Sequence, residues 1–73
     1  RSALVADDDG LADLQTILTQ GLPRLASGGL VALECGLGQP AKLVETARAL
    51  GYARSEARRD LTRRDRFVWA WAP

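Results

Sequence analysis

The sequence predicts a small α/β domain with elements in the order helix, strand, helix, strand, strand. Two stretches, residues 11–18 and 43–50, place apolar side chains at helical spacing. Two others, residues 30–34 and 66–72, are short apolar runs typical of strands. With 73 residues, the chain has room for one domain, residues 1–73.

The first helix is expected to begin near Leu11, with Leu14, Ile17 and Leu18 continuing its apolar stripe. A break of serine and two glycines at residues 27–29 ends this unit. The run Leu-Val-Ala-Leu-Glu that follows has no strict polar alternation, which is typical of a strand covered on both faces.

The second helix is expected to begin at Pro40 and to stop at Gly51, because proline suits a helix start and glycine a helix end. Residues 53–60 form a weaker strand candidate, and residues 61–65 form a turn. The final run, residues 66–72, predicts a central strand, because both of its alternating faces are apolar and should be buried.

These elements predict a sheet with the strand order first, third, second. A strand–helix–strand unit forms a right-handed crossover between parallel strands. The last strand follows a short turn, so it should run antiparallel to its predecessor and lie between the other two. We therefore expect a three-stranded mixed sheet with an antiparallel central strand.

Composition excludes several classes of protein. Cys35 is the single cysteine, which gives no disulfide framework and favours a reducing, cytoplasmic setting. No apolar run approaches the roughly 20 residues that span a bilayer. The chain has no methionine and starts abruptly, which indicates a part excised from a longer protein; a trimmed start is the alternative.

The loop Glu-Cys-Gly-Leu-Gly-Gln-Pro, residues 34–40, lacks the signature of a nucleotide site. A dinucleotide fingerprint needs three glycines, and the third position here is Ala41. Cys35 near a helix start could act as a nucleophile, but the chain has no histidine to serve as its base. A strand-to-helix turn is the favoured reading.

Acidic residues give two further candidates for a binding site. Glu34 ends a strand and could face a crevice at the carboxyl edge of the sheet. Asp7, Asp8 and Asp9 could gather a cation, but three adjacent acids do not make a closed shell, and helix capping is favoured. We therefore expect no metal site, no catalytic residue and no cofactor-binding residue within the chain.

Six arginines gather in the last third of the chain and could track phosphates. They are Arg54, Arg58, Arg59, Arg63, Arg64 and Arg66. Asp60 and Asp65 lie among them and can pair with them. A solvated hairpin end is favoured over contact with RNA, and a stand-alone interaction module remains the alternative function.

Three segments together resemble the HemK/PrmC family of S-adenosylmethionine-dependent methyltransferases. Residues 3–11 resemble its A-L-x-G-G-x-D-G-L segment, and residues 25–39 resemble L-x-P-G-G-x-L-x-x-E-x-G-x-x-Q. Residues 51–68 resemble its ending, through Gly51, Tyr52, Asp60, Leu61, Arg66 and Val68. The resemblance covers nearly the whole chain.

This resemblance implies a parent enzyme that methylates a glutamine side-chain amide of a protein such as a peptide-chain release factor. The family's cofactor-binding glycine motif and its N-P-P-Y motif are absent here. The chain would therefore be the C-terminal half of a catalytic domain, and it would form the C-terminal portion of a Rossmann-like class I methyltransferase sheet. It would neither bind the cofactor nor turn over alone, and it would offer Asp9, Gly10 and Glu34 to the substrate.

The resemblance also implies partners. The first is the N-terminal half of the same catalytic domain, and a release factor is the second. By analogy with the family, both helices should lie on one face of the sheet, which would leave a bare strand edge and an exposed apolar face. We therefore expect the isolated chain to form a dimer or a higher oligomer.

Overall fold

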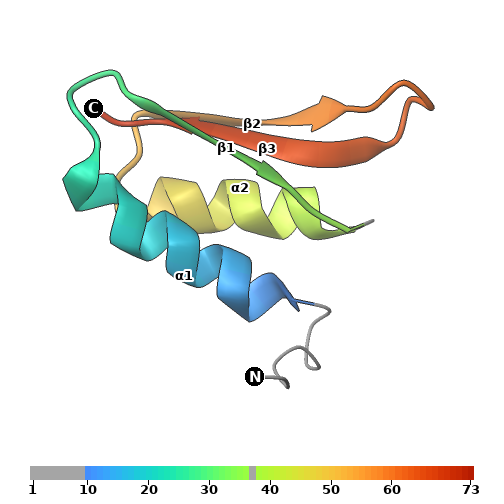
Figure 1. Ribbon diagram of the computed structural model, residues 1–73, viewed down its shortest axis with the longest axis horizontal. Helices are drawn as coiled ribbons and strands as arrows, with labels where there is room; N and C mark the ends of the chain where they lie inside the picture. Colours follow the sequence, from blue (N-terminus) through green and yellow to red (C-terminus); the bar gives the residue numbers. More distant parts are fainter. Residues whose placement is uncertain (1–9, 37) are drawn as a thin grey trace.

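The computed structural model describes residues 10–36 and 38–73 and arranges them in two layers (Figure 1). Its elements are α1 (Leu11–Gly21), a 3-10 turn (Leu22–Arg24), β1 (Leu30–Glu34), α2 (Gln39–Leu50), β2 (Arg54–Arg59) and β3 (Asp65–Trp71). The predicted order of helices and strands is confirmed.

Helix α1 begins directly after Gly10, which occupies the N-cap position with a φ of 89°. Leu18 is fully buried, whereas its neighbour Ile17 is 45% exposed, so one stripe of the helix faces the core. The hydroxyl of Tyr52 donates a buried hydrogen bond of 2.7 Å to the Leu18 carbonyl oxygen. This contact fixes the end of α1 against the chain that follows α2.

Helix α2 has a left-handed glycine at each end, Gly38 with φ 83° and Gly51 with φ 109°. Only glycine adopts such φ values without strain, so these two glycines determine where the helix begins and ends. The side-chain amide of Gln15 on α1 donates to the hydroxyl of Thr46 on α2 at 2.9 Å. The two helices are thus joined by polar contacts as well as by packing.

The sheet has the predicted strand order, β1-β3-β2, with β3 in the centre. Both ladders are antiparallel, so the expectation of a mixed sheet was wrong. The crossover through α2 does make β1 and β2 run parallel, but β3 lies between them, and no parallel ladder forms. Among the described residues, β1 has no partner on its outer side and is an edge strand.

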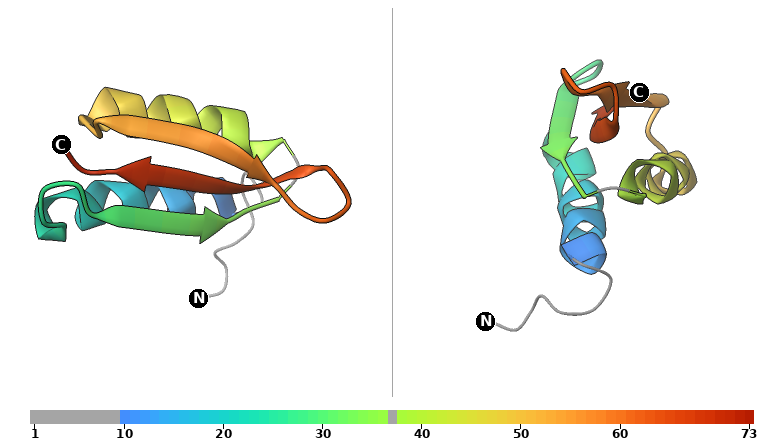
Figure 2. Two further views of the ribbon diagram at one scale, coloured as in Figure 1. Left: turned by 90° about the horizontal axis from the view of Figure 1, so that it is seen from above. Right: turned by 90° about the vertical axis from the view of Figure 1, so that its right-hand side faces the viewer.

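Both helices cover the same face of the sheet, as Figure 1 and the view from above in Figure 2 show. On this inner face, Val68 and Ala70 of β3 are fully buried against Leu18, Leu43 and Ala47. These side chains form the core of the domain.

The opposite, outer face of the sheet has no helix on it within the described part of the chain (Figure 2). Leu30 of β1 is 44% exposed, and Trp69 and Trp71 of β3 are only half-buried. The prediction that both faces of these two strands are covered was therefore wrong. The apolar side chains of these strands, on which that prediction rested, alternate between the buried inner face and the open outer face of the sheet.

Within the described residues, no helix is both long enough and apolar enough to cross a membrane.

Candidate functional site

An open hollow of about 380 Å³ lies where β1 ends, between the starts of α1 and α2. Its lining is drawn from four elements and the loop after β1. The lining residues are Gly10, Asp13, Leu14, Glu34, Cys35, Gly36, Gln39 and Arg66. The carboxyl end of a strand next to a crossover helix is where α/β proteins bind ligands, so this hollow is the candidate site.

Arg66 and Cys35 meet in the lining of the hollow, although 30 residues separate them in the chain. The backbone N–H of Cys35 donates to the Arg66 carbonyl oxygen at 2.7 Å. In return, Nε of Arg66 donates to the Cys35 carbonyl oxygen at 3.1 Å. This reciprocal pair extends the β1–β3 ladder by one residue and fixes Arg66 in the lining of the hollow.

The loop from β1 to α2 is closed on itself by a second reciprocal pair. The backbone N–H of Gly36 donates to Oε1 of Gln39 at 2.7 Å, and the N–H of Gln39 donates to the Gly36 carbonyl oxygen at 3.2 Å. Gln39 is buried. Because the Gly36 N–H already donates to Gln39, it is not available as a phosphate-binding donor.

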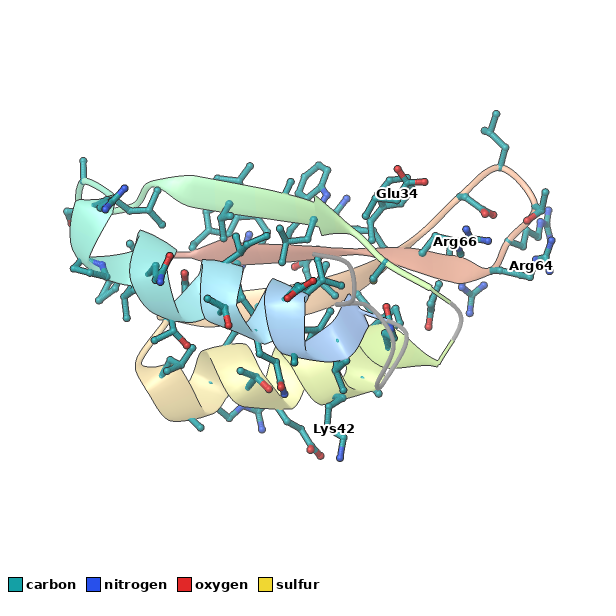
Figure 3. The ribbon with its side chains drawn as sticks, turned by 60° about the horizontal axis from the view of Figure 1, so that its bottom comes forward. Glu34, Lys42, Arg64 and Arg66 are labelled. Carbon is teal, nitrogen blue, oxygen red and sulfur yellow. The ribbon has the colours of Figure 1, made fainter. Side chains whose placement is uncertain are left out.

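Two of the three predicted substrate-facing residues, Gly10 and Glu34, line the hollow. Glu34 stands at the end of β1, and Figure 3 shows its side chain on the side of the sheet away from the helices. Its register partner on β3 is Phe67, which shares that outer side. Asp9 lies outside the described residues, as do Asp7 and Asp8.

The thiol of Cys35 is a poor nucleophile in this setting. Burial raises the pKa of Cys35, Arg66 acts in the opposite direction, and the negative charge of Glu34 adds to the increase. The thiol lies 3.5 Å from the Arg66 carbonyl oxygen, to which it can donate. Because a thiol must lose its proton to attack, the raised pKa makes Cys35 less reactive.

Sequence reasoning did not assign Arg66, Gln39 or Asp13 to the site. Arg66 was treated as one of the charged residues of the hairpin, and it is the register of β3 that brings it to the hollow. Arg66 and Gln39 both stand at positions of the family motifs quoted above, and that was the available signal. Asp13 gave no signal beyond its place on the polar side of α1.

The arginine-rich hairpin between β2 and β3 is partly neutralised by its own acids. Arg54 and Arg58 pair with Glu56, and Arg59 pairs with Asp65. The carboxylate of Asp60 accepts hydrogen bonds from Thr62 and Arg64, and these bonds, that of the Thr62 hydroxyl above all, lower the pKa of Asp60.

The described residues form a small α/β unit in which β1 is an edge strand and an open hollow lies at the end of β1. No family model matches the chain. Three curated relatives do match it, and all three carry the name release factor glutamine methyltransferase.

The relative from Salmonella typhimurium is 42% identical over 60 residues, which is 82% of this chain and 22% of the relative. Those from Coxiella burnetii and Pseudomonas aeruginosa are 36% and 38% identical over 96% and 99% of this chain, and 25% and 26% of their own lengths. The resemblance to the HemK/PrmC-type methyltransferases is confirmed, and the chain spans about a quarter of the length of these relatives.

Proposed function

We propose that this chain is the C-terminal portion of the catalytic domain of an S-adenosylmethionine-dependent methyltransferase in the cytoplasm. The parent transfers a methyl group to a glutamine side-chain amide of a protein, with a peptide-chain release factor as the leading candidate. The observation that carries this proposal is identity of 36–42% to three release factor glutamine methyltransferases across most of the chain.

The free edge of β1 supports the proposal. An edge strand with unpaired backbone groups favours the addition of another strand. Since β1 is an edge only within the described residues, the N-terminal half of the catalytic domain is proposed to continue the sheet from it. The hollow at the end of β1 would then lie next to that added half, with Gly10 and Glu34 toward the substrate.

The described residues do not fit the cofactor by themselves. In the loop after β1, the N–H groups of Gly36 and Gln39 donate within the loop, and the hollow is wide open to solvent. In the parent, S-adenosylmethionine supplies the methyl group and is held by the other half of the domain. The role proposed for Arg66 and Gln39 is to fix the loop that forms one wall of the site.

The coding sequence upstream of Arg1 tests this proposal. We expect a glycine-rich strand–loop–helix followed by N-P-P-Y shortly before the described region. A start codon directly before Arg1 would contradict it and would favour a stand-alone module. A second test uses the isolated 73-residue chain, which should neither bind S-adenosylmethionine in calorimetry nor transfer methyl groups. Measurable methyl transfer by this chain would refute that expectation.

The alternative function, RNA contact by the hairpin, stays a prediction. Its signature is binding to single-stranded RNA that weakens steeply as salt is added. The ion pairs of Arg54, Arg58 and Arg59 with neighbouring carboxylates reduce the positive charge available for such contacts.

A further inference from the structure

The hairpin that joins β2 to β3 projects beyond the end of β1, at the same end of the domain as the hollow. Glu34, the last residue of β1, lies in one row with Phe67 of β3 and Arg58 of β2. The strands β2 and β3 continue past this row into residues 60–64, which we call the hairpin tip (Figure 1). A macromolecule that reaches into the hollow from this edge therefore meets the hairpin tip.

A short stretch of β3 joins the hairpin tip to the hollow. Arg66 lines the hollow, and Arg64, at the end of the hairpin tip, is two residues away in the chain. Figure 3 shows Glu34, Arg66 and Arg64 at the same end of the sheet. None of residues 60–64 lines the hollow itself, so the hairpin tip is a separate surface beside the candidate site.

Asp60 fixes the backbone of the hairpin tip. One oxygen of its carboxylate accepts hydrogen bonds from the backbone N–H of Thr62 at 2.8 Å, from the Thr62 hydroxyl at 2.6 Å and from the backbone N–H of Arg64 at 3.2 Å. The backbone N–H of Asp60 donates to the Arg64 carbonyl oxygen at 2.9 Å and closes the turn. A surface that is already ordered loses less conformational entropy when a partner binds.

The side chains on this fixed backbone are available to a partner. Leu61 is fully exposed, and Arg63 and Arg64 are exposed as well. At the base of the hairpin tip, Arg59 pairs with Asp65 at 3.6 Å. Arg63 forms no ion pair within the part of the chain that the structure describes. The hairpin tip thus presents an apolar side chain beside a positive charge that no carboxylate neutralises.

Arg63 carries this charge at a backbone position that suits glycine better. Its φ is 66°, and no other non-glycine residue among those described has a positive φ. Glycine adopts such a φ without steric cost, whereas arginine does not. Residues that are kept in strained backbone conformations are concentrated at functional sites. An arginine here therefore points to a use for its charge outside the fold.

We propose that the hairpin tip docks the protein that the parent methylates, with Arg63 against a carboxylate of that protein and Leu61 against an apolar contact beside it. This inference rests on the function proposed above and adds a binding surface away from the methylated glutamine. An apolar centre with a charged rim is typical of contacts between proteins. Proteins that bind single-stranded RNA stack its bases on aromatic side chains, and residues 60–64 contain none.

Methyl transfer to a release factor by the full parent chain tests the proposal. Arg63→Gly removes the charge and relieves the backbone, so this variant should unfold at the same urea concentration as the parent or at a higher one. Its KM for the release factor should rise roughly two- to fivefold, the effect of one exposed ion pair, with kcat unchanged. Added salt should narrow the difference between variant and parent, because salt screens exposed charges.

Two further variants serve as controls. Arg48→Ala removes a positive charge from the last turn of α2, at the opposite end of the domain from the hairpin tip (Figure 1), and should leave KM unchanged. Leu61→Ser removes the apolar contact and should raise KM by an amount that does not depend on salt. An Arg63→Gly variant with the KM of the parent would overturn the proposal, as would an equal rise in KM for Arg48→Ala.

The outcomes separate this inference from the proposed function. A parent that transfers no methyl group to a release factor refutes the proposed function and the docking together. A parent that methylates the release factor equally well with Arg63 or with glycine at that position refutes the docking alone. The docking is also refuted if Arg63→Gly weakens binding to single-stranded RNA and leaves KM for the release factor unchanged, because the hairpin tip is then an RNA contact.

Discussion

The two faces of the sheet are made from the same strands and behave differently. On the inner face, Val68 and Ala70 of β3 are fully buried beneath the helices. On the outer face, Trp69 and Trp71 of the same strand are half-buried, and arginines of β2 stack over their rings. On β3, the side chains that face the helices are small, and those on the outer face are large and aromatic.

This difference shows that apolar character alone does not identify a core. The inner face stabilises the fold, since its side chains are removed from water by the helices. The outer face keeps large apolar surfaces where a partner can reach them, and that is a mark of an interaction surface. Substitutions on the inner face should therefore change the free energy of unfolding, whereas substitutions on the outer face should mainly change association with a partner.

The largest effect is expected from Leu18→Ala. This substitution removes a fully buried side chain from the inner core and should lower the free energy of unfolding by about 2–5 kcal/mol. Such a loss would leave little of the stability of so small a domain. The neighbouring Ile17→Ala, at a position that is 45% exposed, is the control.

Urea unfolding of the two variants gives the comparison directly. Ile17→Ala should shift the free energy of unfolding by well under half of the Leu18→Ala change. Equal losses of the free energy of unfolding in the two variants would mean that the core does not lie on the inner face around Leu18.

A smaller effect is expected from Tyr52→Phe, which removes the 2.7 Å hydrogen bond to the Leu18 carbonyl oxygen. That oxygen also accepts from the backbone N–H of Leu22, so it keeps one partner. The free energy of unfolding should fall by about 1 kcal/mol. A loss as large as that of Leu18→Ala would show that the ring itself has been displaced.

The outer face should contribute less to the fold. Arg54→Ala and Arg58→Ala each remove a guanidinium from an exposed indole face, a contact that contributes roughly 0.5–1 kcal/mol at such sites. The emission of the nearby tryptophan should change in each case, while the fold is retained. A variant that unfolds would show that the outer face is part of the core.

The smallest effect is a gradual loss of stability in alkali. Burial raises the pKa values of Cys35 and Tyr52 from ordinary values of 9.0 and 10.0. As pH increases, the unfolded chain loses these protons first, so the free energy of unfolding falls beginning near pH 9. Below that pH both groups are protonated in both states and contribute no slope.

The double variant Cys35→Ala/Tyr52→Phe is the control for this effect. Its free energy of unfolding should vary less between pH 8 and pH 11 than that of the natural sequence. An unchanged pH dependence would show that other groups cause the slope.

Much of the fold was predictable from local signals. The strand at residues 30–34, the start of α1 at Leu11 and the stop of α2 at Gly51 follow from apolar runs and glycines. The central position of β3 followed from its turn and its two apolar faces. The mixed sheet and the two covered faces were wrong, since a strand's apolar pattern does not reveal which neighbours are present.

The candidate site was less predictable for a physical reason. Glu34 could be proposed from its place at a strand end, and Gly10 followed from the resemblance to the family. Arg66 could not, because its reciprocal pairing with Cys35 depends on the register between two strands that are distant in sequence. Such register is a property of the folded sheet.

A segment exchange tests the central claim, that this chain serves as part of a methyltransferase catalytic domain, most directly. The stretch of the Salmonella typhimurium release factor glutamine methyltransferase that matches this chain would be replaced by the corresponding residues of this chain. Transfer of labelled methyl groups to a release factor would then be measured. We predict that the chimera transfers methyl groups. Adding Leu18→Ala to the chimera should lower both the rate of methyl transfer and the thermal stability of the chimera. A chimera that folds and binds S-adenosylmethionine but transfers nothing would contradict the account.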